Sequence, residues 1–264
     1  MKFNMEIEVL ASTMNQEDYS IIEKMNIQTG AIIVNQCNIN KISNIGYNNN
    51  NIKFMSLNER GVGLSRNTAL MRASGKVVVF ADEDEIFING YDKVINKEFL
   101  KHPKADMIIF NVPSLNPKRK TANIEKEKRI HKYNCMKFGA VNFAVKLDFL
   151  KKNNINFSLL FGGGAKYISG EDSLFIIDVL NNKGKVFASK EVIANVEQND
   201  STWFEGFNEK YFISKGALFY AISKSSYKFL CLQFLIRHSY VFKKVGFWKA
   251  LHLMEKGAKE LKII

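Results

Sequence analysis

The sequence predicts an α/β protein with a mainly parallel central sheet flanked by helices, and three observations support this prediction. Short apolar runs rich in β-branched residues alternate with stretches of helical spacing over the first 85 residues. The resulting order of strand, helix, strand, loop, strand, helix and strand is typical of a parallel sheet with crossover helices. Residues 77–80 are apolar at every position, as in a strand that is buried on both faces of a sheet. The order in which the strands pair cannot be derived from this pattern.

The composition is that of a globular protein with one large domain or two halves that share a sheet. The chain has 264 residues, of which 46% are apolar and 12% are aromatic, and a chain of this length can bury a substantial core. The first residues lack the apolar core of a signal peptide, and no uncharged apolar run approaches the roughly 18 residues of a membrane span. We therefore expect a cytoplasmic protein. The three cysteines and four histidines are scattered, which argues against a zinc site or a disulfide framework.

The formal net charge of +12 is unevenly distributed along the chain. Residues 118–137 contain eight Lys or Arg and two Glu, and the stretch from residue 221 to the end contains nine Lys or Arg and two Glu. Such an excess suits nucleic acid, anionic lipid or phosphorylated substrates as partners. Charge alone does not choose among them.

Four strands and two helices are predicted in the first half of the chain. The strands are expected at residues 7–11, 31–34, 52–55 and 77–80. The helices are expected at residues 18–25 and 64–73, and Gly75 suits the C-cap of the second helix. Residues 43–51 are rich in asparagine and have no period, so a loop is expected there.

Four acids follow the last of these strands almost directly. Asp82, Glu83, Asp84 and Glu85 bring negative charge to the carboxyl end of the strand, which is where ligands bind in open α/β sheets. Side chains two residues apart on an extended segment point the same way, so Asp82 and Asp84 can converge on one hard cation while Glu83 faces elsewhere. The alternative is a solvated acidic turn, since exposed carboxylates are common.

The second half is predicted to mix strands, helices and longer loops. Strands are expected at residues 106–112, 138–145, 185–188 and 192–196. Helices are expected at residues 91–100, at residues 146–152 and from residue 211 to the C-terminus. Residues 116–137 are polar and basic and are expected to form a loop or hairpin on the ligand side. Residues 198–207 form a polar, aromatic loop, in which Trp203 either stacks on a sugar ring or packs the loop against the core.

A second informative stretch runs from residue 161 to residue 177. The three consecutive glycines at 162–164 permit close approaches that a side chain would block, as expected of a loop that lies against a ligand. Glu171 and Asp172 then open a helix whose apolar positions nearly encircle it, so we expect this helix to be buried and its acids to be held in a fixed frame. The alternative role of these acids is to compensate the helix dipole.

The C-terminal helices combine apolar and basic residues. Residues 229–236 and 241–253 mix Phe, Leu, Ile and Trp with lysines. Basic amphipathic helices of this kind lie on anionic membrane surfaces, but a helical cap packed on the sheet needs the same amphipathic pattern. Both interpretations stay open at this point.

Three sequence blocks follow one another along the chain: NERGVGLSRNTAL, GKVVVFADEDE and FGGGAKYISGEDSLF. In this order and spacing they resemble the inverting family 2 glycosyltransferases of the GT-A fold, particularly the bacterial capsule and exopolysaccharide sugar transferases. The resemblance covers about residues 5–220. It implies a GT-A domain at residues 1–215, with a nucleotide-sugar-binding half at 1–112 and an acceptor-binding half at 113–215. Residues 216–264 are then the C-terminal amphipathic basic helices.

The resemblance also implies which residues bind the donor. The residues that would line a nucleoside pocket are Thr13, Asn15 and Asn35. Arg66 would contact the base or a phosphate. Asp82 and Asp84 would form the DxD motif that holds ribose and a Mn²⁺ or Mg²⁺ ion bridging the diphosphate.

Catalysis is assigned by the resemblance to the start of the buried helix. Asp172 matches the catalytic base, with Glu171 beside it, and we expect Gly163, Gly164 and Trp203 to face the acceptor. A helix N-terminus lowers the pKa of a carboxylate, whereas burial and the adjacent acid raise it. The sequence does not say which of these effects is larger.

The chain departs from the usual family pattern at three points. Asn35 stands where the family often has an aspartate that reads uracil, so the base of the donor is open. Glu85 replaces a common second aspartate at the end of the acid cluster. No histidine is placed as a further metal ligand.

The function that follows is a metal-dependent inverting glycosyltransferase. It would move a hexose from a nucleotide sugar, most simply a UDP-sugar, to a lipid-linked saccharide acceptor in surface polysaccharide biosynthesis. Such an acceptor would place the protein peripherally on the inner face of the cell membrane, with an anionic membrane surface as a partner. The oligomeric state stays open.

Two alternatives belong to other classes. VFADEDE also resembles the strand and DxD entry of haloacid-dehalogenase-type phosphatases, but those enzymes have the motif near the start of the chain, whereas 81 residues precede Asp82 here. A non-enzymatic basic module that binds nucleic acid is the third candidate. We do not expect nucleic acid as a partner, because two acid clusters at the ligand face would repel phosphate unless a metal intervened.

Overall fold

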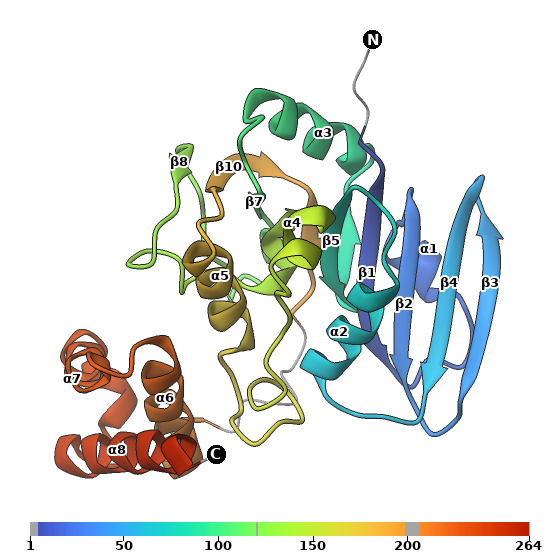
Figure 1. The fold of residues 1–264 in the computed structure, drawn as a ribbon. Coiled ribbons are helices and arrows are strands. Elements are labelled where there is room, and N and C mark those ends of the chain that lie inside the picture. The colour runs from blue at the N-terminus through green and yellow to red at the C-terminus, as the bar shows by residue number, and fades with distance from the viewer. Residues whose placement is uncertain (1–4, 120, 199–205, 264) are drawn as a thin grey trace.

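The computed structural model describes residues 5–119, 121–198 and 206–263. Within these residues a nine-stranded sheet forms the centre of the molecule, in the order β3-β4-β2-β1-β5-β9-β7-β10-β8 (Figure 1). Its strands are β1 (Ile7–Met14), β2 (Gly30–Gln36), β3 (Lys41–Tyr47), β4 (Asn50–Leu57), β5 (Val77–Asp82), β7 (Met107–Asn111), β8 (Lys128–Arg129), β9 (Phe143–Lys146) and β10 (Val186–Val192). A small second sheet pairs β6 (Glu85–Phe87) with β11 (Ala194–Val196).

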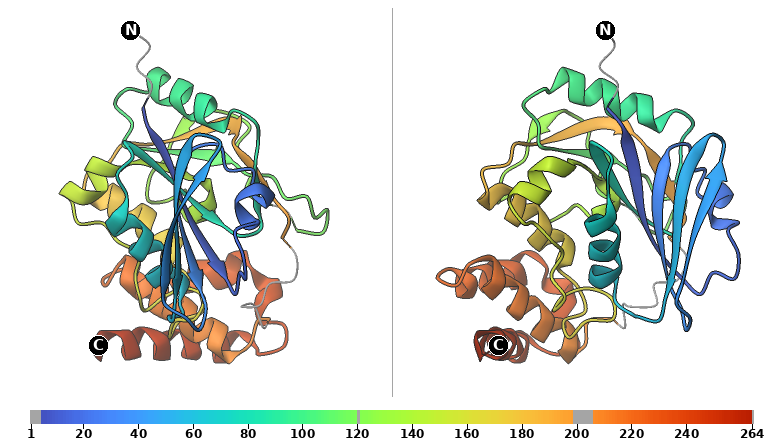
Figure 2. Two further views of the ribbon diagram at one scale, coloured as in Figure 1. Left: turned by 90° about the vertical axis from the view of Figure 1, so that its right-hand side faces the viewer. Right: turned by 45° about the vertical axis from the view of Figure 1, so that its right-hand side comes forward.

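Helices cover both faces of the large sheet and end the chain. They are α1 (Ile21–Lys24), α2 (Val62–Arg72), α3 (Tyr91–Lys101), α4 (Leu147–Lys152), α5 (Glu171–Asn181), α6 (Glu209–Ile222), α7 (Tyr227–Arg237) and α8 (Phe247–Ile263), with short 3₁₀ helices η1 (Ala140–Asn142) and η2 (Ser239–Phe242). Figure 2 shows α2 and α4 on one side of the strands and α1 on the other. In the part of the chain that the structure describes, none of the helices has the length and apolar character needed to cross a membrane.

The first half of the sheet is parallel, as the sequence predicts. β1 lies between β2 and β5 and runs parallel to both, and β4 runs parallel to β2. The register places Ser12 beside Asp82 and Thr13 beside Asn35. The polar carboxyl ends of three neighbouring strands therefore meet at one edge of the sheet, where the acid cluster begins.

The second half of the sheet makes the whole sheet mixed. β9 runs antiparallel to both β5 and β7, β10 is parallel to β7, and β8 pairs antiparallel with β10 at the edge. The α/β class is confirmed. Because β9 is antiparallel to both β5 and β7, β7 and β10 run in the same direction as β1, β2, β4 and β5, so most strands of the sheet share one direction, and β3, β8 and β9 run against it. The strand–helix alternation behind that prediction is clear only in the first 85 residues, so it carried no information on the direction of β9.

The stretch 43–51, predicted to be a loop, is mostly a strand. β3 pairs antiparallel with β4, and Asn48 and Asn49 form the two-residue turn between them with φ of +48° and +63°. Asparagine tolerates this left-handed conformation better than most residues. The side chains of β3 are exposed or half-buried on this edge strand, so no alternating apolar pattern marks it in the sequence.

Several other elements differ from the predicted ones in extent. α1 is a single turn rather than a helix over 18–25, and the strand predicted at 138–145 begins with the 3₁₀ helix η1. The basic stretch 116–137 is anchored by three buried side chains, which are Ile124, Ile130 and Cys135. Gly75 is not the C-cap of α2, since the helix ends at Arg72 and its C-cap is Ala73. Gly75 instead allows a close approach to β1, because a Cβ there would lie 2.7 Å from the Cβ of Glu8.

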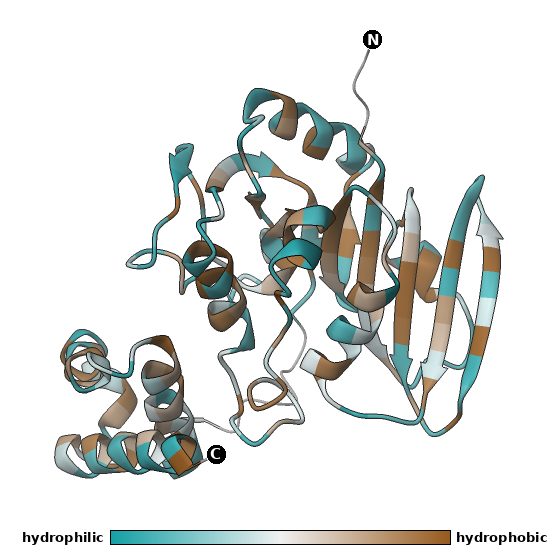
Figure 3. Cartoon of the chain, in the orientation of Figure 1, coloured by the Kyte–Doolittle hydropathy of each residue, from teal (hydrophilic) through white to brown (hydrophobic). Residues whose placement is uncertain are grey.

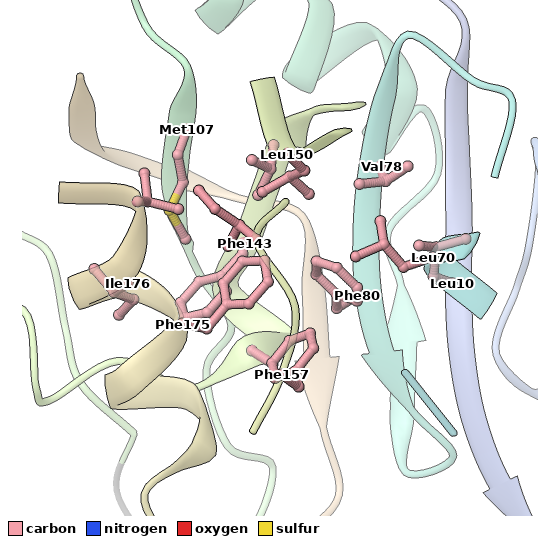
Figure 4. Packing of buried hydrophobic residues seen from close by; sticks show 14 of the residues in the cluster. Leu10, Leu70, Val78, Phe80, Met107, Phe143, Leu150, Phe157, Phe175 and Ile176 are labelled. Carbon is pink, nitrogen blue, oxygen red and sulfur yellow. The ribbon is translucent and has the colours of Figure 1, made fainter. Parts of the chain in front are cut away.

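An aromatic cluster joins the two halves of the sheet beneath the acid clusters. The Phe157 ring stacks on Phe175 of α5 at 4.2 Å and meets Phe80 of β5 edge-on at 5.0 Å (Figure 4). All three rings belong to the apolar core on one face of the sheet, and aromatic pairs of this geometry add specific packing energy to burial. The cluster holds the start of α5 next to the carboxyl end of β5.

The three C-terminal helices pack on each other around a small core of their own. α6 and α8 approach so closely that a Cβ on Gly216 would lie 1.8 Å from the carbonyl oxygen of Met254, and a Cβ on Gly257 would lie 1.9 Å from that of Ile213. Only glycine permits such backbone contact. The predicted boundary at residues 215 and 216 falls within α6, and the helices pack together from Glu209 onward.

Candidate active site

A cavity of about 690 Å³ opens at the carboxyl ends of β1, β2 and β5 and faces the start of α5. Its size is that of a small-molecule site, and its place in the sheet is the one at which α/β folds bind ligands. It is lined by Ser12, Thr13, Met14, Gln16, Ser20, Ile21, Lys24, Gln36, Val62, Arg66, Asp82, Glu83, Asp84, Arg119, Gly163, Ile168, Glu171, Asp172, Glu197 and Gln198.

The four acids after β5 have different surroundings. Asp82 and Asp84 line the cavity, whereas Glu85 is fully buried on β6 and accepts a hydrogen bond from the backbone N–H of Asp82 at 3.0 Å. Glu83 does not face elsewhere, as the sequence pattern predicted, but lines the same cavity. Its Oε2 accepts hydrogen bonds from Thr13 Oγ1 at 2.6 Å and from the backbone N–H of Met14 at 3.0 Å. The chain turns after Asp82, so the alternation of an extended strand does not continue through the cluster.

Arg66 of α2 connects the acids of β5 with those of α5. It is 3% exposed, and its Nη2 donates to Asp82 Oδ1 and Oδ2 at 2.9 and 3.1 Å. Its Nη1 donates to Asp172 Oδ1 at 2.8 Å and lies 3.6 Å from Glu171 Oε1. The guanidinium also lies 5.2 Å from the centre of the Phe157 ring. Both terminal nitrogens are thus engaged by carboxylates. Arg66 also lines the cavity, and its contact with a base or phosphate of the donor stays a prediction.

Glycines at the start of α2 and in the loop 162–164 allow the starts of α2 and α5 to lie close together. Gly63 packs against residue 158, where a Cβ would lie 2.8 Å from a carbonyl oxygen. A Cβ on Gly162 would lie 2.8 Å from the carboxyl carbon of Glu171, and one on Gly164 would lie 3.1 Å from the Cα of Gly61. Gly163 lines the cavity, but Gly164 does not. The glycine loop therefore serves contact between the starts of α2 and α5, and only one of the two predicted acceptor glycines reaches the cavity.

Burial raises the pKa of both acids of α5. The pKa of Glu171 is raised to about 7, chiefly by burial and then by the charge of Asp172, with Arg66 acting in the opposite direction. The pKa of Asp172 is also raised, chiefly by burial, which Arg66 again opposes. The side chain of Asp172 is 26% exposed and that of Glu171 is 12% exposed. Burial thus exceeds the opposing effects of Arg66 and of backbone hydrogen bonds on both pKa values. Asp172 is the more exposed of the two acids.

The remaining acids add to the negative charge of the site. Burial and the neighbouring Asp82 raise the pKa of Asp84, and the same two causes raise the pKa of Glu85 well above its usual range. These shifts arise chiefly because burial disfavours the charged form of each carboxyl group, and then because other carboxylates lie close by. A divalent cation would relieve this crowding.

Asp82 and Asp84 fit a Mn²⁺ or Mg²⁺ ion by the chemistry of their donor atoms. Carboxylate oxygens are the hard ligands that these ions prefer, and Mg²⁺ is usually held by one or two carboxylates together with phosphates of a substrate. Among the described residues, no group of three or more His, Cys, Asp or Glu side chains is arranged to hold a metal. A complete coordination sphere at Asp82 and Asp84 would therefore include oxygens of a ligand.

The three residues predicted to line a nucleoside pocket differ in their position relative to the cavity. Thr13 lines the cavity, whereas Asn15 and Asn35 do not. Asn35 is fully buried, and its side chain accepts from the backbone N–H of Gln16 at 3.0 Å and donates to the carbonyl of Gln16 at 2.9 Å. It thereby holds Gln16, whose Nε2 donates to Glu83 Oε2 at 3.1 Å. Trp203 lies outside the described residues.

Sequence reasoning missed several polar residues that line the cavity. They include Gln16, which follows β1, Gln36, which is the last residue of β2, and Lys24, which is the last residue of α1, and none of them belongs to a motif. Arg119 lies in the basic stretch that was expected on the ligand side. That charge excess was the only signal in the sequence that pointed to Arg119. The cavity wall thus carries cations as well as the acids.

Solved structures share this fold at low sequence identity. S. aureus TarS 1–349 in complex with UDP-GlcNAc matches with a TM-score of 0.67 and 18% identity, over 96% of this chain and 82% of that one. The same TarS fragment in complex with UDP matches with a TM-score of 0.67 and 18% identity, over 97% of this chain and 82% of that one. The mannosyltransferase PcManGT from Pyrobaculum calidifontis in complex with GDP-Man and Mn²⁺ matches with a TM-score of 0.52 and 12% identity, over 99% of this chain and 76% of that one.

No protein-family model matches the sequence, and no curated protein matches it. The likeness to solved structures therefore bears on the fold. It extends over nearly the whole chain, so it includes the sheet, the flanking helices and the C-terminal helices. The chain has the α/β fold with a mixed central sheet that is found in GT-A glycosyltransferase structures.

Proposed function

We propose that the protein is a metal-dependent inverting glycosyltransferase that moves a hexose from a nucleotide sugar, most simply a UDP-sugar, to an acceptor hydroxyl. The observation that carries this proposal is the cluster in which Arg66 joins Asp82 to Asp172 beside a cavity of about 690 Å³. The GT-A fold and the complexes of its structural neighbours with UDP-GlcNAc or with GDP-Man and Mn²⁺ support a nucleotide-sugar donor.

Asp172 is the proposed catalytic base. An acceptor hydroxyl is a poor nucleophile until a carboxylate takes its proton, and such a base works best when its pKa lies near the working pH. Burial raises the pKa of Asp172, and its side chain is the more exposed of the two acids of α5. Glu171 is buried beside it, and the charge of Asp82 adds to the effect of burial in raising the pKa of Asp172. Direct in-line attack by the acceptor oxygen then inverts the anomeric carbon.

Asp82 and Asp84 are the proposed ligands of a Mn²⁺ or Mg²⁺ ion. When bound, the ion offsets the charge that develops on the nucleoside diphosphate leaving group. Arg66 orients the carboxylate of Asp82 through two hydrogen bonds. Thr13 and Glu83 at the end of β1 and β5 would meet the nucleoside, with Gln16 held by Asn35 beside them.

The acceptor is proposed to be a lipid-linked saccharide of a bacterial surface polysaccharide, reached from the inner face of the cell membrane. Gly163 lines the cavity next to Asp172 and is the proposed contact for this acceptor, with Gly164 supporting the loop and Trp203 as a further candidate. The excess of basic residues in the C-terminal stretch supports such a setting, because it favours anionic surfaces.

Neither alternative class is favoured by an observation. A phosphatase of the haloacid dehalogenase type needs the first aspartate of its motif as a free nucleophile, whereas both oxygens of Asp82 accept hydrogen bonds from Arg66. A nucleic-acid module would have to bind phosphates beside five crowded carboxylates. The fold of the chain is also that of GT-A structures.

The test is a transfer assay with a panel of nucleotide sugars, with Mn²⁺ or with EDTA, and with extracted lipid-linked saccharides as acceptors. Asp172→Asn is expected to abolish transfer while donor binding, measured as a thermal shift, stays close to wild type. Asp178→Asn is the matched control, because this exposed residue lies on the same helix. Near wild-type transfer by the Asp172 variant would refute the role of the base. If no nucleotide sugar raises the melting temperature with Mn²⁺, the donor class is wrong.

A further inference from the structure

The outer face of α7 carries apolar side chains that the rest of the described structure leaves uncovered. Phe229, Leu232 and Ile236 are 64%, 40% and 67% exposed. Their spacing of three and four residues places them on one side of the helix. Cys231 and Leu235 are fully buried on an adjoining side of the helix, against α6 and α8. The helix is thus firmly packed on one side and presents an apolar stripe on another.

Exposed apolar side chains are concentrated in this part of the molecule. Of the fifteen large apolar side chains that are exposed among the described residues, six lie between residues 229 and 263. Tyr240 and Trp248 are among them, at 57% and 78% exposed. Hydrophobic and hydrophilic residues alternate along the C-terminal helices, as Figure 3 shows for α8. Single exposed apolar residues need no explanation, but a continuous stripe with basic neighbours indicates a binding surface.

The charged residues on α7 and in the turn after it are all basic, and the nearest acids along the chain are Glu209 on α6 and Glu255 on α8. Residues 210–254 contain eight Lys or Arg and no Asp or Glu. At about 100° per residue, Lys228 and Arg237 lie on the two flanks of the stripe. Lys243 and Lys244 are exposed in the turn that follows it. The surface therefore combines apolar side chains at its centre with cations on both sides.

This combination distinguishes among the partners that could cover it. A second copy of the chain in a two-fold contact would set the same basic flanks against each other, which costs energy. A polyanion without apolar groups would leave the stripe exposed. A bilayer with anionic head groups satisfies both features, since its acyl region accepts Phe, Leu and Ile while its head groups attract the lysines and arginine. We infer that α7 and the turn after it form the face by which the protein docks on an anionic lipid bilayer.

The docking face has a fixed position relative to the candidate active site. α6 packs directly on the start of α5, because a Cβ on Gly170 would lie 2.8 Å from a methyl carbon of Leu218. The Ser214 hydroxyl of α6 accepts a hydrogen bond from the backbone N–H of Ile168 at 3.2 Å. Docking through α7 would therefore hold the catalytic helix at one height above the membrane, a consequence that rests on the proposed function. The docking itself does not depend on any transferase activity.

The test uses the full-length protein and vesicles, with no donor or acceptor. We expect the wild type to co-sediment with vesicles that contain about 30% phosphatidylglycerol in phosphatidylcholine, and to do so weakly with phosphatidylcholine alone. Phe229→Gln/Ile236→Gln is expected to reduce partitioning into the anionic vesicles by roughly tenfold or more, since both apolar contacts are lost. Lys228→Glu/Arg237→Glu is expected to abolish the preference for anionic lipid.

Controls separate this outcome from misfolding and from self-association. Met71→Gln/Leu100→Gln removes two side chains of similar exposure on α2 and α3 and is expected to bind as the wild type does. All variants should keep wild-type melting temperatures to within a few degrees, because these side chains are exposed. Failure of the wild type to bind anionic vesicles, equal loss in the control pair, or a dimer in light scattering that the Phe229 and Ile236 changes dissociate would each overturn the proposal.

Discussion

Replacing Arg66 with methionine is expected to lower the free energy of unfolding by about 3 kcal/mol at pH 8. The guanidinium is 3% exposed and makes charge-assisted hydrogen bonds to Asp82 and Asp172, with Glu171 at 3.6 Å. Removing one partner of a buried ion pair costs about 3–5 kcal/mol, because the other charge is left without compensation. Asp82 and Asp172 are 36% and 26% exposed and can regain water, so the lower end of that range applies.

The loss is expected to depend on pH in a defined direction. Arg66 lowers the pKa values of Glu171 and Asp172 in the wild type, against the raising effect of burial. Without it both folded-state pKa values rise further above those of the unfolded chain. An acid whose pKa is raised on folding stabilises the native state below its unfolded pKa, and that stability is lost as the pH rises through the folded pKa. The deficit of the variant should therefore be small at pH 5 and grow toward pH 8.

Urea unfolding of wild type and variant at pH 5 and pH 8 measures both effects. Arg72→Met is the matched control, because Arg72 is exposed on the same helix, and its change is expected within about 0.5 kcal/mol. Equal stability of the two variants at pH 8 would refute the reasoning. So would a deficit of the Arg66 variant that stays constant between the two pH values.

Three further changes test other parts of the structure. Glu171→Gln removes an acid whose pKa is raised to about 7, so the melting temperature of the variant should fall less than that of the wild type between pH 5 and pH 8. Asp84→Asn should reduce the thermal shift caused by UDP with Mn²⁺ but leave the shift caused by UDP with EDTA unchanged, and equal shifts with Mn²⁺ in variant and wild type would contradict metal binding there. Gly216→Ala would place a Cβ 1.8 Å from the Met254 carbonyl oxygen, so we expect a loss of about 1–3 kcal/mol in urea unfolding from the separation of α6 and α8. Gly46→Ala, which has no neighbour within 4 Å, is its control and should cost little.

The main elements of the fold could be predicted from the sequence because a buried strand or helix has a recognisable run or period of apolar residues. β5 is apolar and buried from Val77 to Ala81, and α5 has apolar residues on most of its sides, several of which belong to the core against the sheet. β3 has no such pattern, because the side chains of this edge strand are exposed or half-buried. The direction of β9 also could not be predicted, because strand pairing depends on contacts between residues far apart in the chain.

The candidate site was predicted in part. The three sequence blocks identified Asp82, Asp84 and Asp172, and the structure brings all three to one cavity. Thr13, Arg66 and Gly163 also line it, whereas Asn15, Asn35 and Gly164 do not. Whether a residue lines the cavity depends on the direction in which it points at the end of its strand or loop. A turn of one residue reverses that direction, and the sequence does not specify it.

By itself, the sequence determined the α/β class, the buried strand that ends in acids and the buried helix that opens with Glu171 and Asp172. The tertiary structure alone decided how these acids interact. Arg66 lies 106 residues from Asp172 in the chain, and only the packing of α2, β5 and α5 around Phe157 brings the guanidinium between the two acid clusters. The pKa of Glu171 follows from the same packing, because burial and Coulomb interactions depend on distance in space and not on separation along the chain.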